Sequence, residues 1–319
     1  MAKLSLPSLE QINLARTKIS PYIVRTPLIK LNIEGSNEIY LKLENLQPIG
    51  AFKIRPALNS LLSLPKKQLT KGVFTISSGN MALGLAWAAN KLKVKMVGYV
   101  YLGAPEAKLS GIRELGGEIR YLPTETWWRC LYKDEELSTE ETEIHTVLNN
   151  EVLAANGTIA MEILEDLPDV DEIYVPFGGG SCAVGIANAI QKLAANVTVS
   201  AVESSHGSPL AQSIAAKKPV RIETENTYIK SIGGDSVFAQ IFTFVNQLSV
   251  KNTVVNIDKI SQTIGLLFHK NKIITEGAGA ASVAAAMENS NNHKKIVCVV
   301  TGGNIDDKDF IKILNGERP

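Results

Sequence analysis

Short apolar runs that end in glycine or polar turns alternate with helical patterns along most of this chain. Strands bounded in this way and separated by helices form βαβ units. The alternation therefore predicts an α/β fold with mostly parallel sheets covered by helices. The expected strands are residues 38–44, 72–77, 94–102, 118–123, 172–178, 197–203 and 295–303.

A triple-glycine loop follows one of these strands, at the carboxyl end where parallel sheets bind ligands. In "VPFGGGSCAVG" (175–185) the glycines let a ligand approach the backbone, and amide groups at the start of the next helix favour an anion such as phosphate. A flexible turn is the alternative interpretation. The loop lacks the GxGxxG spacing of dinucleotide sites, and Ile186 and Ala187 stand where a Walker loop has Lys and Ser or Thr.

Two other loops repeat this strand-then-turn design. Residues 75–90 run from a strand through Ser77, Ser78 and Asn80 into a helix, and "VCVVTGGNID" (297–306) ends another strand in two glycines. Helix capping or a structural turn explains each loop taken alone. Three such loops in one α/β chain favour a shared ligand site.

Lys53 lies between Phe52 and Ile54, directly ahead of an apolar helical run. A charged amine is costly to desolvate, so burial here lowers the pKa of a lysine. A lowered pKa increases the fraction of free, nucleophilic amine. The position therefore indicates a reactive lysine.

Composition excludes several classes of function. The 319 residues include 33 basic and 32 acidic side chains, giving a net charge of +1, and no basic run suited to nucleic acid is present. The N-terminal segment has no continuous apolar run, so we expect neither secretion nor membrane insertion but a cytoplasmic protein. Three cysteines without a CxxC pair argue against a disulfide framework or a structural zinc site: Cys130, Cys182 and Cys298.

Several of these stretches, taken in order, resemble the fold-type II pyridoxal-phosphate family, in its serine/threonine dehydratase and serine racemase branch. The resemblance implies a two-lobed fold like that of tryptophan synthase β, with pyridoxal 5'-phosphate in the cleft, and a homodimer. It also implies a large cofactor domain of residues 1–68 and 141–319 and a small domain of residues 69–140. The matching stretches are "RTPLIKL" (25–31), "GAFKIRPALN" (50–59), "SSGN" (77–80), "TIAMEI" (158–163), "VPFGGGS" (175–181), "EGAGAA" (276–281) and "VTGGNID" (300–306).

The resemblance also implies roles for individual residues. Lys53 forms the Schiff base with the cofactor aldehyde and then removes the substrate α-proton, Phe52 packs near the ring, and Asn80 hydrogen-bonds its 3-hydroxyl. Ser78 matches the acid/base that racemases place opposite the lysine. The other implied cofactor residues are Gly178, Gly179, Gly180, Ser181, Cys182, Glu276 and Thr301. The substrate carboxylate is expected at Ser77, Ser78, Gly79, Asn80 and Met81.

Thr301 falls where the family places a hydroxyl against the pyridine nitrogen, and this residue type bears on the reaction. A neutral hydroxyl does not stabilise a protonated ring as an aspartate would. The α-carbanion is then less delocalised into the ring, which favours loss of a β-substituent over transamination. The implied activity is a lyase that converts L-serine or L-threonine to a 2-oxo acid and ammonia. The alternatives are an amino-acid racemase, a dehydratase of a bulkier β-hydroxy amino acid, and a catalytically inert cofactor-binding protein.

The chain departs from the family pattern at Ala51, Pro56 and Met81, where relatives usually have serine, glycine and histidine. The loss of polar groups beside the carboxylate loop suits a bulkier or more apolar substrate. Trp127 and Trp128 are candidates to line such a pocket, although adjacent tryptophans are as often core and surface packing.

Two carboxylates have two interpretations each. Glu203 matches the first ligand of a divalent-cation site found in racemases and some dehydratases, but Pro209 replaces the second, so we predict no metal. Glu203 then only ends a strand. Glu276 is expected near the cofactor ring or, alternatively, as a carboxylate that the helix dipole favours.

Overall fold

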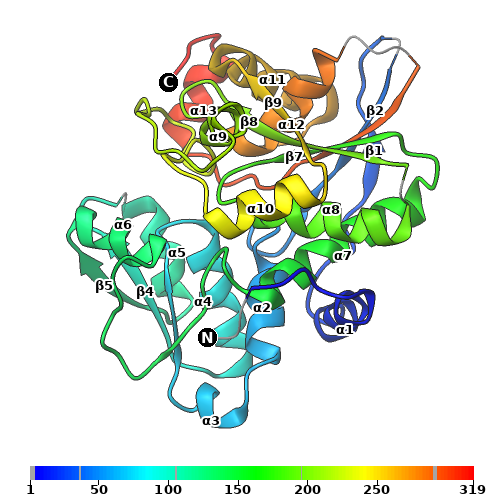
Figure 1. Cartoon of the computed structure of the whole chain (residues 1–319). Coiled ribbons are helices and arrows are strands. Elements are labelled where there is room, and N and C mark those ends of the chain that lie inside the picture. Colours follow the sequence, from blue (N-terminus) through cyan, green and yellow to red (C-terminus); the bar gives the residue numbers. More distant parts are fainter. Residues whose placement is uncertain (1–3, 36, 105, 195, 290–292) are drawn as a thin grey trace.

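The computed structural model describes residues 4–35, 37–104, 106–194, 196–289 and 293–319. Two sheets, each with helices packed on it, form two lobes (Figure 1), which confirms the expected α/β fold. The six-stranded sheet has the order β1 (Leu28–Lys30), β2 (Glu38–Lys42), β10 (Lys295–Val299), β7 (Glu172–Pro176), β8 (Thr198–Ser204), β9 (Lys251–Val255). The four-stranded sheet has the order β5 (Glu118–Leu122), β4 (Met96–Tyr101), β3 (Val73–Ile76), β6 (Thr142–Glu143).

All neighbouring strands run parallel except β1, which is antiparallel to β2. Helices connect most of the strands. Their bounds are α1 (Leu9–Ile19), η1 (Glu44–Leu46), α2 (Ile54–Leu62), α3 (Lys66–Leu69), α4 (Asn80–Leu92), α5 (Glu106–Glu114), α6 (Thr124–Tyr132), α7 (Asn150–Asp166), α8 (Ser181–Leu193), α9 (Pro209–Ala216), α10 (Ala239–Gln247), α11 (Ile257–Asn271), α12 (Gly277–Met287) and α13 (Asp307–Leu314).

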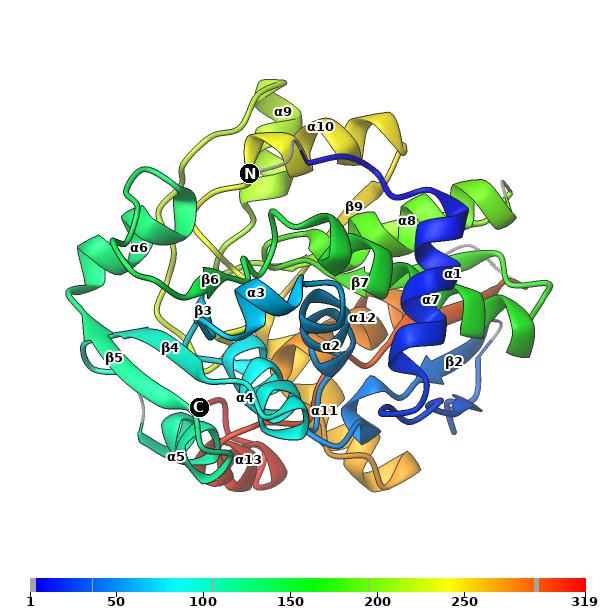
Figure 2. The same ribbon diagram turned by 90° about the horizontal axis from the view of Figure 1, so that it is seen from below.

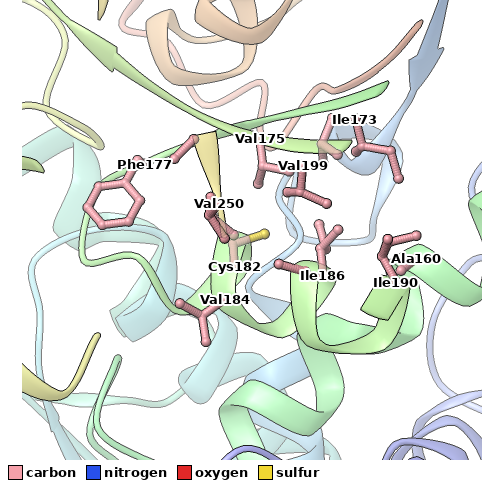
Figure 3. Packing of buried hydrophobic residues seen from close by; sticks show 14 of the residues in the cluster. Ala160, Ile173, Val175, Phe177, Cys182, Val184, Ile186, Ile190, Val199 and Val250 are labelled. Atoms are coloured by element: carbon pink, nitrogen blue, oxygen red, sulfur yellow. The ribbon is translucent and has the colours of Figure 1, made fainter. Parts of the chain in front are cut away.

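The large sheet is buried on both faces. Ile173 and Val175 of β7 pack toward α7 and α8, whereas Tyr174 between them packs against the helices of the opposite face, α11 and α12. Figure 3 shows the first of these layers, in which Ile186 and Ile190 of α8 point toward the strands. Because successive strand side chains alternate between faces, burial on both sides favours apolar residues at most positions.

The small sheet is covered in the same way. Val73 and Met96 pack with α4 and α5, while Phe74 and Val97 pack with Trp127 of α6. Figure 2 shows α5 and α6 on opposite sides of β4 and β5. All strands predicted from the sequence are present, although β10 and β7 end before the predicted runs do, at Val299 and Pro176. The proposed domain boundaries stay a prediction.

A cluster of four charged side chains is buried where α2 and α7 meet the large sheet. Arg55 donates to Glu44 at 2.8 Å and to Glu162 at 2.7 Å, and Lys42 donates to Glu162 at 2.6 Å. The Lys42 ammonium also donates to the carbonyl of Thr26 at 2.6 Å. Lys42, Glu44 and Arg55 have no exposed surface. The two positive and two negative charges compensate one another, which is the condition for burying ions.

In the described part of the chain no helix is both long enough and apolar enough to span a bilayer. The three cysteines are buried and unpaired. Cys182 packs in the core layer of Figure 3, beside Val175 and Ile186.

Candidate active site

Lys53 immediately precedes α2 and is half-buried. Its Nζ lies 4.9 Å from the centre of the Phe52 ring. Desolvation lowers the pKa of Lys53 to about 8, an effect that electrostatic interactions with Cys182 and Glu276 partly oppose. A lysine with this pKa has roughly 300 times more free amine at pH 7 than an ordinary lysine. The lowered pKa predicted from the sequence is confirmed.

The amine of Lys53 also lies next to the triple-glycine turn. Nζ donates to Oγ1 of Thr146 at 3.4 Å, and the carbonyl oxygen of Thr146 accepts a hydrogen bond from Ser181 Oγ, also at 3.4 Å. Ser181 is the first residue of α8. Thr146 was not among the predicted site residues, because a single threonine in the chain between the small sheet and α7 matches no motif.

The glycine turn between β7 and α8 has no room for side chains. Gly180 has a φ of +87°, a conformation that only glycine adopts readily. Added Cβ atoms would lie 2.5 Å from Ser231 O at Gly178, 2.3 Å from Val147 Cγ2 at Gly179 and 2.5 Å from Ile241 Cγ2 at Gly180. Within the described residues the amide groups from Gly178 to Cys182 donate no hydrogen bond. Free amides at a helix N-terminus bind anions, so the turn supports a phosphate site.

A polar network fixes the side chain of Asn80, the first residue of α4. Asn80 Nδ2 donates to Glu276 Oε1 at 2.9 Å, and Asn80 Oδ1 accepts from Asn304 Nδ2 at 2.8 Å. The hydroxyl of Ser231 donates to the same Glu276 oxygen at 3.1 Å. The network sets the orientation of the Asn80 amide and leaves its second N–H hydrogen for a ligand. Ser231 and Asn304 were not predicted, because both are common residue types in loops.

Glu276 is also the N-cap residue of α12, but its side chain makes no capping hydrogen bond. It is 8% exposed and faces the Asn80 amide. This contact joins Glu276 to the predicted cofactor loop, and a position near the cofactor ring stays a prediction.

Thr301 lies just beyond β10 and against the segment that carries Lys53. The amide of Phe52 donates to the carbonyl of Thr301 at 3.0 Å, and Ala51 pairs with Gly302. The Thr301 side chain is 3% exposed, and its Oγ1 has no partner among the described residues. A buried hydroxyl without a partner is costly, so this atom is suited to a ligand that accepts or donates a hydrogen bond there.

The loop from Ser77 to Met81 leads from β3 into α4. Ser77 Oγ accepts a hydrogen bond from the amide of Gly79 at 3.3 Å, and Ser78 is half-buried without a hydrogen bond of its own in the described residues. The Met81 side chain packs in the core of the small lobe with Ala51 and is 2% exposed. Its side chain therefore belongs to the core of the small lobe.

Glu203 has a structural role. Its carboxylate accepts hydrogen bonds from the amides of Leu210 and Ala211 in the first turn of α9, at 2.8 and 2.9 Å, and from Asn252 at 3.0 Å. Burial raises the pKa of Glu203. A carboxylate engaged by a helix N-terminus satisfies amides that otherwise lack partners. The described residues contain no cluster of three or more His, Cys, Asp or Glu side chains that would hold a metal.

The tryptophan pair of α6 packs rather than lining a pocket at Lys53. Trp127 is 7% exposed, and its Nε1 donates to the carbonyl of Tyr99 at 2.9 Å in the small lobe. Trp128 is 38% exposed and stacks on Tyr132. Their arrangement matches the core and surface packing interpretation.

Together these features define a class of protein, in which a lysine of lowered pKa lies near a helix N-terminus whose free amides are suited to an anion. The sequence profile of the pyridoxal-phosphate dependent enzymes matches residues 19–302, and the chain belongs to this family. Its cofactor is pyridoxal phosphate. The unpaired Thr301 hydroxyl and the free amides of the glycine turn fit this cofactor, because a hydroxyl can hydrogen-bond a ring nitrogen and free amides can bind a phosphate group.

Three proteins of known class show what this chain is similar to. The chain is 32% identical to the L-threonine ammonia-lyase of Thermotoga maritima over 319 residues, which cover 97% of this chain and 78% of that one. Maize serine racemase superposes with a TM-score of 0.88 at 27% identity, covering 98% of both chains. A threonine deaminase from T.th. superposes with a TM-score of 0.82 at 27% identity, covering 94% of this chain and 99% of that one.

Gly180→Ala is expected to weaken cofactor binding at least about tenfold, because the Cβ forces the turn and its amides to move away from the anion. Gly116→Ala is the matched control, since Gly116 also has a positive φ of 80° but no neighbour within 4 Å of its Cβ position. Titration with pyridoxal phosphate, followed by fluorescence quenching, measures both affinities. Equal affinity in the two variants would contradict the role of the turn.

Proposed function

We propose that the chain is a pyridoxal-phosphate-dependent ammonia-lyase that converts a β-hydroxy amino acid, such as L-threonine or L-serine, to a 2-oxo acid and ammonia. The identity to an L-threonine ammonia-lyase over 97% of the chain supports this reaction. The observation that carries it is the neutral, buried hydroxyl of Thr301, which has no partner among the described residues. Opposite the ring nitrogen, a neutral group favours elimination over transamination.

The residues of the site have different roles in this reaction. The amides of Gly178, Gly179, Gly180 and Ser181 would hold the phosphate, and Asn80 would donate to the ring oxygen. When bound, the cofactor supplies an electron-withdrawing system that acidifies the Cα–H bond of the substrate.

Lys53 Nζ would hold the cofactor and, as a free amine, would accept the proton from Cα of the substrate. Its pKa of about 8 suits proton transfer near neutral pH. The loop from Ser77 to Met81 offers amides at the start of α4 to the substrate carboxylate.

A substrate panel tests the proposal. L-serine, L-threonine and bulkier β-hydroxy amino acids are incubated with the cofactor-loaded protein, and 2-oxo acid and ammonia are measured. We expect equal amounts of the two products from at least one substrate. A yellow protein that is labelled by borohydride but inert on the whole panel would refute the lyase proposal and support the non-enzymatic alternative.

An amino-acid racemase is the second candidate, since maize serine racemase shares the fold over 98% of both chains. Ser78 would then act on the face of the substrate opposite Lys53. Chiral chromatography of serine after incubation measures this activity. If the protein is a racemase, Ser78→Ala abolishes inversion and largely spares elimination. Absence of D-serine with the wild-type protein would exclude a serine racemase.

We also propose that the protein is a cytoplasmic homodimer, with a small domain of residues 69–140 inserted in a large domain of residues 1–68 and 141–319. The expectation of a dimer rests on the family resemblance. Light scattering coupled to size-exclusion chromatography measures the mass of the particle, and a value near that of one 34.5 kDa chain would contradict the dimer.

A further inference from the structure

The side chain of His145 hydrogen-bonds within the turn that carries Thr146 and to α6. The Nδ1 atom of His145 accepts hydrogen bonds from the amides of Val147 at 3.0 Å and Leu148 at 2.9 Å. Nε2 lies 3.0 Å from the carbonyl oxygen of Leu131, to which it donates. Burial lowers the pKa of His145 to about 4, so the imidazole is neutral near pH 7 and can accept and donate in this way.

The same turn is anchored on its other side to the glycine loop. The side chain of Val147 occupies the space beside Gly179, where an added Cβ would lie 2.3 Å from Val147 Cγ2. The hydroxyl of Ser181 donates to the carbonyl of Thr146 at 3.4 Å. The backbone of Thr146 is therefore fixed between α6, through Leu131, and the start of α8. A side chain on so constrained a backbone has a defined direction.

The hydroxyl of Thr146 is the hydrogen-bond partner of Lys53 in the described structure, with 3.4 Å between Nζ and Oγ1. A carboxylate at this position would stabilise the ammonium and raise the pKa of the lysine. A neutral hydroxyl orients the amine without adding a charge, so desolvation remains the dominant effect on the pKa of Lys53. The hydroxyl accepts a hydrogen bond from the ammonium and can donate one to the free amine, so the contact persists when Lys53 loses its proton.

We propose that Thr146 is a positioning residue for Lys53, one that holds the amine in the direction required to capture the cofactor aldehyde. This inference rests on the proposed function only in taking Lys53 as the residue that binds the cofactor. The Thr146 hydroxyl itself neither forms a bond to the substrate nor transfers a proton.

The test uses the full-length protein from which cofactor has been removed with hydroxylamine. The rate of recapture of pyridoxal phosphate is measured by absorbance from pH 6 to 10, and the pKa of Lys53 is read from the pH dependence of its reductive methylation. For Thr146→Val we expect the capture rate at high pH, where the amine is fully deprotonated, to fall about tenfold because the amine is no longer oriented. The pKa of Lys53 should fall by roughly half a unit to one unit, since the ammonium loses an acceptor.

Thr146→Ser keeps the hydroxyl and should restore both values. Thr142→Val is the matched control, because Thr142 lies in β6 of the same segment and its variant should behave as wild type. If the valine variant does not fold, Thr146→Ala removes the same hydroxyl and gives the same comparison.

A Thr146→Val or Thr146→Ala protein with the wild-type capture rate and Lys53 pKa would overturn the inference, whatever its lyase activity. Conversely, a wild-type chain that captures the cofactor normally but has no lyase activity would refute the proposed function and leave the role of Thr146 standing.

Discussion

Lys53→Ala is expected to lose 2-oxo acid formation almost completely, with kcat/KM reduced by about 10⁴-fold or more. The variant lacks both the amine that holds the cofactor and the base proposed to remove the α-proton. Borohydride reduction followed by peptide mass spectrometry should find the cofactor on Lys53 of the wild-type protein and on no peptide of the variant. Formation of pyruvate or 2-oxobutanoate at the wild-type rate would show that the assignment of Lys53 is wrong.

Two further variants serve as comparisons for Lys53→Ala. Lys67→Ala removes an exposed lysine from α3 and should leave activity unchanged. Lys53→Arg keeps a positive charge but has no free amine near neutral pH, so it should be as inactive as the alanine variant.

In the wild-type protein, the rate of cofactor capture should rise as the pH increases through about 8, because the amine of Lys53 loses its proton there.

Glu162→Gln is expected to destabilise the fold by about 3–5 kcal/mol, because it leaves a buried positive charge without compensation. Glu162 accepts hydrogen bonds from both Arg55 and Lys42, and its loss leaves Glu44 as the remaining carboxylate of the cluster. Urea denaturation of the two proteins, followed by circular dichroism, measures the difference in the free energy of unfolding.

Glu165→Gln provides the matched control one turn further along α7. Glu165 pairs with Arg16 and Arg25, but its side chain is 42% exposed, so its loss should cost no more than about 1 kcal/mol. Similar losses of stability in the two variants would show that the buried cluster contributes no more than a surface ion pair.

With one exception, the strands that were predicted correctly share one property, which is that most of their side chains are buried, on both faces of the sheet. The exception is β5, an edge strand whose side chains are exposed or half-buried. The strands missed by the sequence analysis lack that property. β9 (Lys251–Val255) is an edge strand in which most side chains are exposed or half-buried, and β6 (Thr142–Glu143) is too short to show a period. β1 (Leu28–Lys30) also lies at an edge of its sheet. Edge strands are defined by the partner they pair with, and that partner lies elsewhere in the sequence.

The predicted site residues belong to continuous motifs, and the missed ones do not. Lys53 and the turn from Gly178 to Ser181 were proposed from the sequence because their local residues indicate a lowered pKa and a special backbone. Thr146 and Ser231 are ordinary residues whose contacts with Lys53 and Glu276 join segments 93 and 45 residues apart. Such contacts leave no periodic or spacing signal in a single sequence.

By itself, the sequence determined the alternation of strands and helices, the reactive lysine and the glycine turn, because each depends on residues that are neighbours along the chain. Only the tertiary structure decided that Glu203 caps a helix, that Trp127 and Trp128 pack, and that Lys42 and Glu162 are buried partners. These outcomes depend on which charges and hydrogen-bond groups meet after folding, since a buried polar group is tolerated only when a partner from another segment reaches it.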